Sequence, residues 1–477
     1  MVSSKLKGLS LLSIIIALIA FLYKKHTDDR LRQKLDHVLS GLLQAEKKAT
    51  PLVPQIKIAI GFGGCLDYVL DALEFAKKFN LTAPDGPEHY DSVESKEQLS
   101  KLFAYFFRYG AAAERFVSNE TLFKEVIKEA EGTARLRKAL GGNAPLMARR
   151  LSLEGANVLL ASHLSEELLK TLPDTIKVIG NPIEVDDIHV ILEYDSGSQW
   201  ENFTAPRANR LIIHSDKRNP YLETLEQFEK ELQGFNPSLL VIGGLQMMDN
   251  FPFQEGERYA RLQKLQNLLA KTKSSTKIHF ELASFTDQSL IQDIIETVVL
   301  YADSLGMNEQ ELPNLISQLT GDNVTLISDP YPRTATVLDQ MRTVYRFLKN
   351  TKEINGHRRL TRLHIHTLAY QAILTSKESQ WKNTMSAAAK ASLTANRYVC
   401  GSDNIDTMKV RLIMDDSFST SKSDFGKRIM FTEDKPVSCW DEEDYKICVA
   451  PVLVCTVVLQ TAGGGDNISS AGLLYQI

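Results

Sequence analysis

The sequence predicts an α/β fold in which a central, mostly parallel sheet is flanked by helices and joined by a smaller α/β lid. Short strand-like apolar runs alternate with stretches of helical periodicity, which is typical of βαβ units. The polar stretch 85–101 and the strands between 175 and 214 are expected to form the smaller lobe. The strand-like runs lie at 56–60, 175–179, 188–194, 210–214, 239–242, 277–282 and 451–461, and the helical patterns at 71–80, 95–109, 221–233, 257–271, 289–302 and 335–350.

Length and charge limit the class of protein. The chain has 477 residues, 43% of them hydrophobic, and its 55 Lys+Arg against 59 Asp+Glu give a net charge of −4. This length predicts two or three domains, or one large unit with an insertion. The balanced charge excludes a nucleic-acid-binding protein whose whole surface is basic. A folded enzyme with no nucleic-acid partner is expected.

The first 26 residues predict a targeting segment. Lys5 and Lys7 precede the apolar run from Leu9 to Tyr23, as in a secretory signal peptide or an uncleaved signal-anchor. A single spanning helix is the alternative, although it normally needs about 20 apolar residues. Residues 27–54 predict an amphipathic helix and a linker. The expected location is the lumen of the endoplasmic reticulum, free or membrane-anchored, or outside the cell, with membrane contact only through the N-terminal segment.

The cysteines and glycosylation sequons also bear on the compartment. An odd count of five cysteines without C-x-x-C spacing argues against a zinc site and against a dense disulfide framework. One disulfide among the last four, or buried free thiols, are both open. Asn-x-Ser/Thr sequons are consistent with the secretory route. The cysteines are Cys65, Cys400, Cys439, Cys448 and Cys455, and the sequons are at Asn80, Asn119, Asn202, Asn323 and Asn467.

A glycine-rich segment near the C-terminus is the strongest local signal. The chain has no P-loop, and its nearest approach to G-x-G-x-x-G, at 61–66, lacks the third glycine. Gly463, Gly464 and Gly465 instead lie between a strand-like run and a helix, where successive amides form an anion hole. Asp466 follows them. It is either a proton acceptor beside that hole or an N-cap.

Gly463-x-Gly465-Asp466 resembles the G-x-G-D motif of the ribokinase superfamily, and further segments resemble its ADP-dependent sugar kinases, most closely the eukaryotic glucose-using members. The resemblance runs through residues 56–477 and implies a kinase domain over 55–477 with a ribokinase-like core. It also implies a lid formed mainly from segments within about 66–215. In chain order the other similar segments are 141–144, 188–194, 205–210, 279–281, 304–311 and 362–367.

The resemblance gives Asp466 the role of general base, taking the proton from the 6-hydroxyl of the sugar. The amides of the three glycines and the guanidinium of Arg210 would neutralise phosphoryl charge. Arg207 is the rival of Arg210, and a surface salt bridge is the alternative for both.

The metal ligands implied are Glu281, Glu311 and Asp466, around Mg²⁺. Strand alternation places His279 and Glu281 on one face, where His279 would orient the carboxylate. The spacing Asn308-x-x-Glu311 predicts one shared helical face. Glu309 is expected to be a solvated residue at the start of that helix.

The sugar-binding residues implied are Asp67, Glu114, Gly141, Gly142 and His189. An acid at Glu114 is similar to the glucose-using members, because phosphofructokinase-type members need basic residues there. The sequence departs from the family at Cys65, where archaeal members often carry Asn. A solvated helix residue is the alternative for Glu114, and a packed core histidine for His189.

The nucleotide-binding residues implied are Arg210, His366, Pro451 and Val452, although a packed core strand explains the pattern around His366 nearly as well. The resemblance therefore implies a monomeric, magnesium-dependent enzyme that uses ADP to phosphorylate glucose, giving glucose 6-phosphate and AMP. The alternatives are an ADP-dependent phosphofructokinase and a catalytically silent, membrane-anchored binder of sugar or nucleotide.

Overall fold

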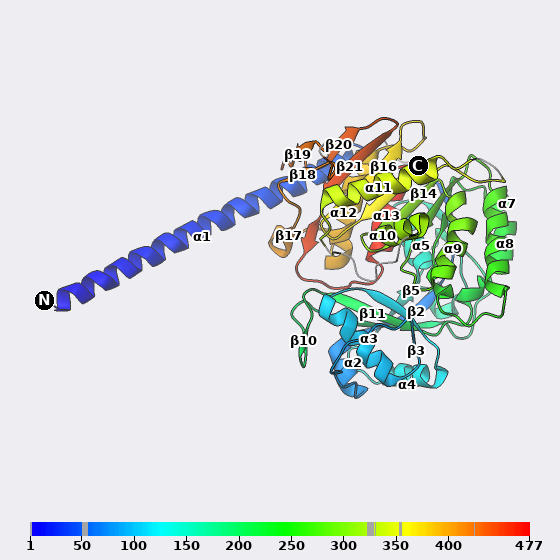
Figure 1. Cartoon of the computed structure of the whole chain (residues 1–477), viewed down its shortest axis with the longest axis horizontal. Helices are drawn as coiled ribbons and strands as arrows, with labels where there is room; N and C mark the ends of the chain where they lie inside the picture. Colours follow the sequence, from blue (N-terminus) through cyan, green and yellow to red (C-terminus); the bar gives the residue numbers. More distant parts are fainter. Residues whose placement is uncertain (1, 50–55, 322–328, 330, 353–354, 424) are drawn as a thin grey trace.

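The computed structural model describes residues 2–49, 56–321, 329, 331–352, 355–423 and 425–477, with side chains from residue 14 onward. Met1, the end of the expected linker at 50–54, the first residue of the expected kinase domain and Asn323 lie outside the described residues. The chain forms a large α/β body, a smaller α/β body beneath it and a projecting N-terminal helix (Figure 1).

A ten-stranded sheet forms the large body, in the order β20-β21-β16-β15-β14-β13-β12-β1-β6-β7. The strands from β7 to β15 are parallel, and β16, β21 and β20 are added antiparallel. In that order they span Ser438–Asp441, Tyr445–Pro451, Tyr370–Ser376, Arg362–His366, Ser304–Asn308, Lys277–Glu281, Leu239–Ile242, Lys57–Gly61, Asn157–Ala161 and Ile176–Ile179.

Both faces of this sheet are buried, because strand residues alternate between two apolar clusters. Ile58 and Ile60 of β1 pack with α5, whereas Ala59 packs with α7 and α8. The helices around the large body are α5 (Asn143–Leu153), α6 (Glu166–Leu169), α7 (Leu225–Phe235), α8 (Glu257–Lys271), α9 (Gln288–Thr297), α10 (Glu311–Thr320), α11 (Thr334–Lys349), α12 (Thr384–Cys400) and α13 (Gly464–Leu474). The alternation in the sequence therefore reflects a sheet covered on both sides.

A six-stranded sheet forms the smaller body, which we call the lid, in the order β3-β4-β11-β8-β2-β5. The strands are Ser92–Val93, Ala113–Val117, Asn209–His214, Ile188–Tyr194, Cys65–Asp71 and Arg137–Gly141. Helices α2 (Ala72–Lys78), α3 (Lys96–Tyr109) and α4 (Glu120–Glu131) lie on the side of the lid away from the large body (Figure 1). Alternate strand residues pack with these helices, so the intervening residues face the large body.

Two sequence predictions about strands are wrong. The strand at 175–179 belongs to the large sheet and not to the lobe, because β7 pairs in parallel with β6. The run 451–461 is not one strand: β21 ends at Pro451, β22 covers Leu453–Cys455, and 456–463 is a loop. β22 leaves the large sheet because it pairs with β17 (Val410–Leu412). Two further small sheets are formed by β9 (Gln199–Trp200) with β10 (Phe203–Thr204) and by β18 (Ser417–Ser419) with β19 (Arg428–Met430).

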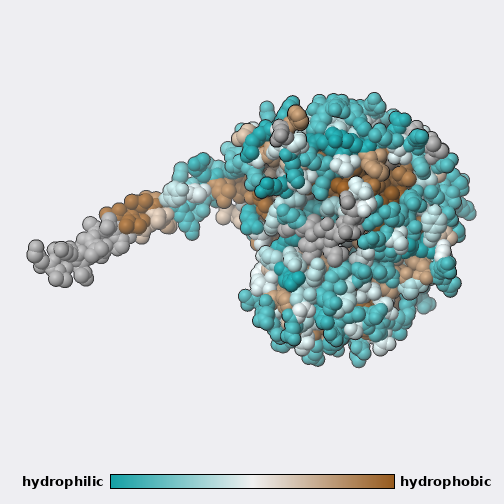
Figure 2. Space-filling view, viewed as in Figure 1, coloured by the Kyte–Doolittle hydropathy of each residue, from teal (hydrophilic) through white to brown (hydrophobic). Residues whose placement is uncertain are grey.

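The expected targeting segment and amphipathic helix form one helix, α1 (Val2–Lys47). Its last turns dock on the large body, where Leu35, Val38 and Leu42 are buried against α12 and Glu46 forms ion pairs with Lys390 and Arg397. The apolar side chains from 14 to 23 are exposed, and Figure 2 shows them as a brown band on the projecting helix. Among the described residues, no helix carries an apolar stretch long enough to cross a bilayer.

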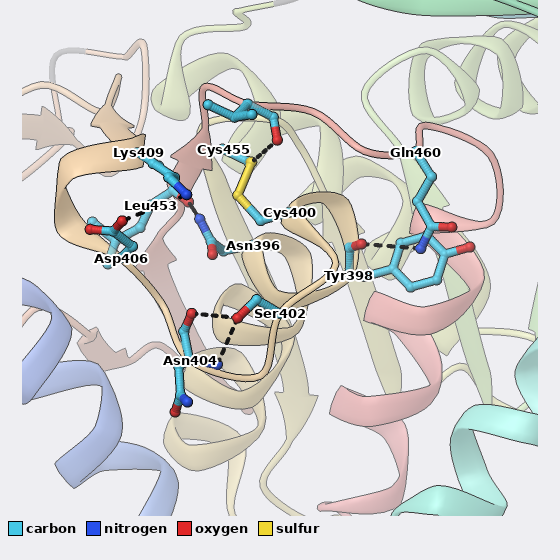
Figure 3. Close-up of a disulfide and its surroundings, with 11 residues drawn as sticks. Asn396, Tyr398, Cys400, Ser402, Asn404, Asp406, Lys409, Leu453, Cys455 and Gln460 are labelled. Atoms are coloured by element: carbon cyan, nitrogen blue, oxygen red, sulfur yellow. Dashed lines mark hydrogen bonds and ion pairs between the residues drawn. A yellow bond between two sulfur atoms is a disulfide. The ribbon is translucent and has the colours of Figure 1, made fainter.

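Two disulfides are present, where the sequence left one disulfide or free thiols open. Cys439 and Cys448 join neighbouring strands β20 and β21. Cys400 and Cys455 join the end of α12 to β22, just before the loop 456–463 (Figure 3). Cys65 is a buried free thiol.

Candidate active site

A cavity of about 370 Å³ lies between the lid and the large body. Its floor comes from the carboxyl ends of β13, β14 and β15 and the start of α13, and its roof comes from β4 and β11 of the lid. In α/β proteins, ligands bind at this end of the parallel strands. The lining residues include Glu114, Asn143, Arg207, Arg210, Glu281, Asn308, Glu309, Glu311, His366, Val452, Thr461, Gly463, Gly464, Gly465 and Asp466.

Asp466 lines this cavity from the first turn of α13. The helix begins at Gly464 with Gly463 as its N-cap, so the alternative that Asp466 caps the helix is wrong. Asn143 Nδ2 donates to Asp466 Oδ1 over 2.9 Å, and Gln246 Nε2 donates to Asn143 Oδ1 over 2.5 Å. Burial raises the pKa of Asp466 to about 7. The carboxylate is therefore held in one orientation with a proton affinity suited to a general base.

Close approaches or backbone geometry constrain Gly463 and Gly465, whereas a Cβ at Gly464 would meet no atom within 4 Å. Gly463 has a φ of +72°, in the left-handed region, so a side chain there would be strained. A Cβ at Gly465 would lie 3.1 Å from Cε1 of His366. The helix therefore begins with exposed amides directly at the cavity, as an anion hole requires.

Glu281 ends β13 and accepts three hydrogen bonds. Its Oε2 contacts His279 Nε2 at 2.9 Å and the Ser469 hydroxyl at 2.5 Å, and its Oε1 contacts His366 Nε2 at 3.2 Å. Burial alone would raise the pKa of Glu281, but the hydrogen bonds from His279 and His366 outweigh burial and lower it. His279 thus orients this carboxylate, and Glu281 stays ionised.

Glu281 is supported by a chain of buried hydrogen bonds that runs from Arg362 through Ser304 to His279. Sequence reasoning missed this chain. Arg362 Nη1 donates to Ser304 Oγ over 3.0 Å, and Ser304 Oγ lies 2.8 Å from His279 Nδ1. The ionised Glu281 carboxylate can only accept and burial lowers the pKa of His279, so Nδ1 carries no proton and accepts from the Ser304 hydroxyl. The proton of His279 is then on Nε2, which donates to Glu281. Ser304 lies in one of the quoted family segments, but no spacing rule connects it to His279.

Glu311 and Asn308 meet by a different geometry from the shared helical face that was predicted. Asn308 ends β14, Glu311 begins α10, and each side chain bonds the other's backbone amide. Burial raises the pKa of Glu311 to about 8, and the nearby Glu281 adds to the rise. Glu309 lines the cavity and burial raises its pKa, so the expectation of a solvated residue is wrong. This buried acidic floor is suited to a divalent cation with oxygen ligands.

The sugar-site residues of the prediction lie together on the lid face. Asp67 and His189 are register partners on β2 and β8, and Glu114 Oε1 lies 3.6 Å from His189 Nδ1. Glu114 lies on strand β4, so the alternative of a helix residue is wrong. Glu114 reaches the cavity, whereas Asp67 and His189 are buried beside it. Burial raises the pKa of Asp67 to about 6.

Asp216 supports His189 and was missed by sequence reasoning. Its Oδ1 lies 2.9 Å from His189 Nε2 and 3.1 Å from His214 Nδ1, and its Oδ2 accepts from Asn219 over 2.6 Å. Burial would lower the pKa of His189, but Asp216 outweighs burial and raises it to about 10. His189 is thus more than a packed core histidine, because three carboxylates surround a charged imidazole.

The predicted glycine pair, Gly141 and Gly142, is absent from the described cavity lining, whereas both arginines belong to it. A Cβ at Gly141 would overlap the Asp67 carboxylate, and Gly142, with a φ of +87°, precedes α5. Arg207 and Arg210 both line the cavity. Arg207 Nε donates to the Gly110 carbonyl, whereas Nε of Arg210 is buried without a hydrogen-bond partner. Neither forms the surface salt bridge weighed for it, because no carboxylate among the described residues pairs with either.

The nucleotide residues separate into two groups. His366 lies with the carboxylates, bonded to Glu281, while Val452 lines the cavity. Pro451 is buried one residue earlier, and its carbonyl accepts from the Ser392 hydroxyl over 2.5 Å. Pro451 is absent from the described cavity lining, which includes its neighbour Val452.

The conserved region of the ADP-specific phosphofructokinase/glucokinase family matches residues 56–475. The chain belongs to this family. Among its relatives, the ADP-dependent glucokinase of Bos taurus is 33% identical over 423 residues, covering 88% of this chain and 84% of that protein. The probable ADP-dependent glucokinase of Caenorhabditis elegans is 31% identical over 436 residues, covering 88% and 85%.

The fold agrees with solved structures of ADP-dependent kinases. One, described as an ADP-dependent kinase complex with fructose-6-phosphate and ADPβS, has a TM-score of 0.65 at 17% identity and covers 93% of this chain and 97% of that one. The predicted family and ribokinase-like fold are confirmed, and the chain is an ADP-dependent sugar kinase.

In this kinase, the lid and the large body also touch through the loop 456–463. Glu193 Oε1 of β8 accepts from the backbone amide of Thr461 over 2.7 Å and from its hydroxyl over 2.6 Å. Arg137 Nη1 of β5 donates to Gln460 Oε1 over 3.3 Å. The loop leading into the glycine motif is therefore held from the lid side.

Proposed function

We propose that the enzyme transfers the β-phosphoryl group of ADP to the 6-hydroxyl of glucose, giving glucose 6-phosphate and AMP. The observation that carries the proposal is the cavity itself, which is lined by the Asp466 carboxylate, by Glu114 on the lid side and by the three glycines at the start of α13. The similarity to the bovine and nematode glucokinases supports the same substrate.

The charge of the sugar-side wall favours glucose over fructose 6-phosphate. Glu114 lies at the cavity with Asp67 and Asp216 behind it, and the one cationic side chain among them, His189, is bonded to Asp216. A second phosphate on the sugar would meet carboxylates there and be repelled. The hydroxyls of an uncharged hexose would instead find strong acceptors.

The residues of this chain divide the chemistry between them. Asp466 accepts the proton of the attacking 6-hydroxyl, while its hydrogen bond from Asn143 keeps the carboxylate aimed at that oxygen. The amides at the start of α13 and the guanidinium of Arg210 stabilise negative charge on the phosphoryl oxygens. Contact between the lid and the loop 456–463 helps to exclude water, so that transfer to sugar prevails over hydrolysis of ADP.

The floor of the cavity fits Mg²⁺, because Glu281 and Glu311 are buried carboxylates close enough for Glu281 to raise the pKa of Glu311. Glu281 and Glu311 would hold the ion, directly or through water, near Asp466. When bound, Mg²⁺ neutralises charge on the diphosphate. The oxygens of Glu281 are already aligned by His279 and Ser469, so little reordering is needed.

Measuring AMP release tests the proposal. ADP with glucose should give stoichiometric AMP and glucose 6-phosphate, and ADP with fructose 6-phosphate should give much less. Asp466→Asn serves as the inactive control, and ATP replaces ADP in a parallel reaction. Equal or better use of fructose 6-phosphate would establish the phosphofructokinase alternative, and no AMP with either sugar would establish a silent binder.

We propose further that the N-terminal segment sends a monomeric enzyme to the endoplasmic reticulum, with membrane contact through α1 only, or to the outside of the cell. Two disulfides support an oxidising compartment. Asn80, Asn119 and Asn202 are exposed sequons, whereas Asn467 is buried and bonded to Gly463 and Arg150, so glycan attachment is expected at the exposed sites. Fractionation of cells expressing the full chain, with glycosidase digestion, would distinguish a lumenal from a cytosolic enzyme.

A further inference from the structure

A thiol, a carboxylate and an imidazole converge on the lid face. One donor atom each from Cys65, Asp67 and His189 lies within 4.8 Å of the others, and all three residues are buried. Cys65 and Asp67 share one face of β2, and Asp67 is the register partner of His189 on β8. The set is formed by the adjacent strands β2 and β8 and not by a C-x-x-C pair in the sequence.

The two donors on β2 have the spacing of ligands on one metal ion. Cys65 Sγ lies 3.3 Å from Asp67 Oδ1. A tetrahedral Zn²⁺ with bonds of about 2.3 Å to sulfur and about 2.0 Å to oxygen separates such atoms by roughly 3.3–3.6 Å. Because the other four cysteines form disulfides, Cys65 is the free thiol of the chain.

His189 is prepared for a metal by its outer partner. Nε2 is bonded to Asp216 at 2.9 Å, whereas Nδ1 is 3.6 Å from Glu114 Oε1. A histidine ligand usually has a carboxylate on its second nitrogen, which fixes the ring and raises its basicity. Glu114 lines the cavity, and the 3.6 Å from its Oε1 to His189 Nδ1 brings it close enough to turn toward an ion held by the other three residues.

We propose that Cys65, Asp67 and His189, with Glu114 as the fourth ligand, bind Zn²⁺ in the sugar site and that the ion excludes glucose. Uptake of the ion releases the thiol proton of Cys65 and a proton of the imidazole. A thiolate selects a soft ion, whereas the all-oxygen floor around Glu281 and Glu311 suits Mg²⁺. Exclusion of glucose rests on the proposed function, while binding of the metal does not.

Co²⁺ is the probe that reports the site without any activity measurement. With excess Mg²⁺ and ADP filling the acidic floor, Co²⁺ should produce a thiolate-to-cobalt charge-transfer absorption at one equivalent, and Zn²⁺ should abolish it. Cys65→Ser should lose the absorption, and the matched control His163→Gln, outside the cluster, should keep it. An absent band in the native enzyme, or an equal band in Cys65→Ser, would overturn the site.

The kinetic arm tests competition. Zn²⁺ should raise the KM for glucose with kcat unchanged, and Cys65→Ser should need at least tenfold more Zn²⁺ for the same rise. If Cys65→Ser fails to bind ADP as the native enzyme does, Asp67→Asn replaces it in the cobalt titration and should weaken the band tenfold or more.

Glucose should bleach the cobalt band. A cobalt band that glucose leaves untouched supports the metal site but overturns its competition with glucose. AMP release from ADP and glucose then tells whether the proposed substrate has failed as well. Zinc inhibition that glucose cannot relieve overturns competition.

Discussion

Two buried histidine–carboxylate clusters face each other across the cavity with opposite charge arrangements. In the lid, Asp216 and Glu114 flank His189, and the pKa of the imidazole rises to about 10 although burial opposes the rise. In the large body, His279 and His366 flank Glu281, and the pKa of the carboxyl is lowered although burial would raise it.

The difference teaches how one cavity can serve a neutral polyol and a charged nucleotide. In the lid cluster, the positive imidazole of His189 is bonded to Asp216, and the carboxylate of Glu114 lines the cavity as an acceptor for sugar hydroxyls. In the large-body cluster, the imidazoles of His279 and His366 keep the Glu281 carboxylate ionised at the proposed cation site. Asp466 lies between them and bonds to neither set, since its partner is Asn143.

The largest effect is expected at Asp466. Asp466→Asn removes the proton acceptor and keeps the shape, so turnover should fall roughly 10²–10⁴-fold. The Michaelis constants for glucose and ADP should change far less, because both clusters remain intact. Steady-state AMP release measures both parameters, and near-native turnover would remove Asp466 from the mechanism.

Breaking the lid cluster should affect only the sugar. Glu114→Ala removes a charged acceptor, which typically costs about 1.5–3 kcal/mol and so raises the KM for glucose about tenfold or more. The KM for ADP should stay nearly constant. Glu125→Ala, an exposed acid of α4, is the control. A glucose KM that stays at the native value would refute a sugar contact at Glu114.

Breaking the other cluster should affect only the cation. Ser304→Ala removes the acceptor of Arg362 and the donor to His279, so the His279 ring that orients Glu281 loses the hydrogen bond on its Nδ1. One hydrogen bond is worth about 1 kcal/mol, so Mg²⁺ affinity should fall about fivefold. Mn²⁺ binding followed by paramagnetic resonance measures it directly.

The control for the fall in Mg²⁺ affinity of Ser304→Ala is Ser152→Ala. Ser152 is a buried serine that is bonded to Thr175 away from the cavity. Ser152→Ala should lower stability without changing metal affinity. A changed glucose KM in Ser304→Ala would contradict the separation of the two clusters.

The smallest effect is expected where the two halves join. Glu193→Gln keeps an acceptor for Thr461 but loses the charge, a change of about 0.5–1 kcal/mol. The KM values for glucose and ADP should both rise about two- to fivefold, because the loop 456–463 serves both sites. A rise in the KM for only one of the two substrates would show that the contact between Glu193 and Thr461 does not couple the sugar site to the nucleotide site. Hydrolysis of ADP without sugar should also increase.

Local sequence determined much of this protein. Alternation of strand and helix patterns predicted the layered sheet, and period-two alternation placed His279 with Glu281, since both depend only on neighbouring residues. The order of short motifs, together with the glycine run before Asp466, was enough to identify the family and to name most of the charged residues that line the cavity.

Only the tertiary structure decided which distant groups meet. Ser469 bonds Glu281 across 188 residues and Arg362 bonds Ser304 across 58, and no local pattern encodes such pairs. β7 belongs to the large sheet and not to the lid, and Cys65 lies close to His189. Both facts follow from the order of the strands in the two sheets. Periodicity tells which face a side chain occupies, whereas the neighbouring strand depends on the packing of the whole chain.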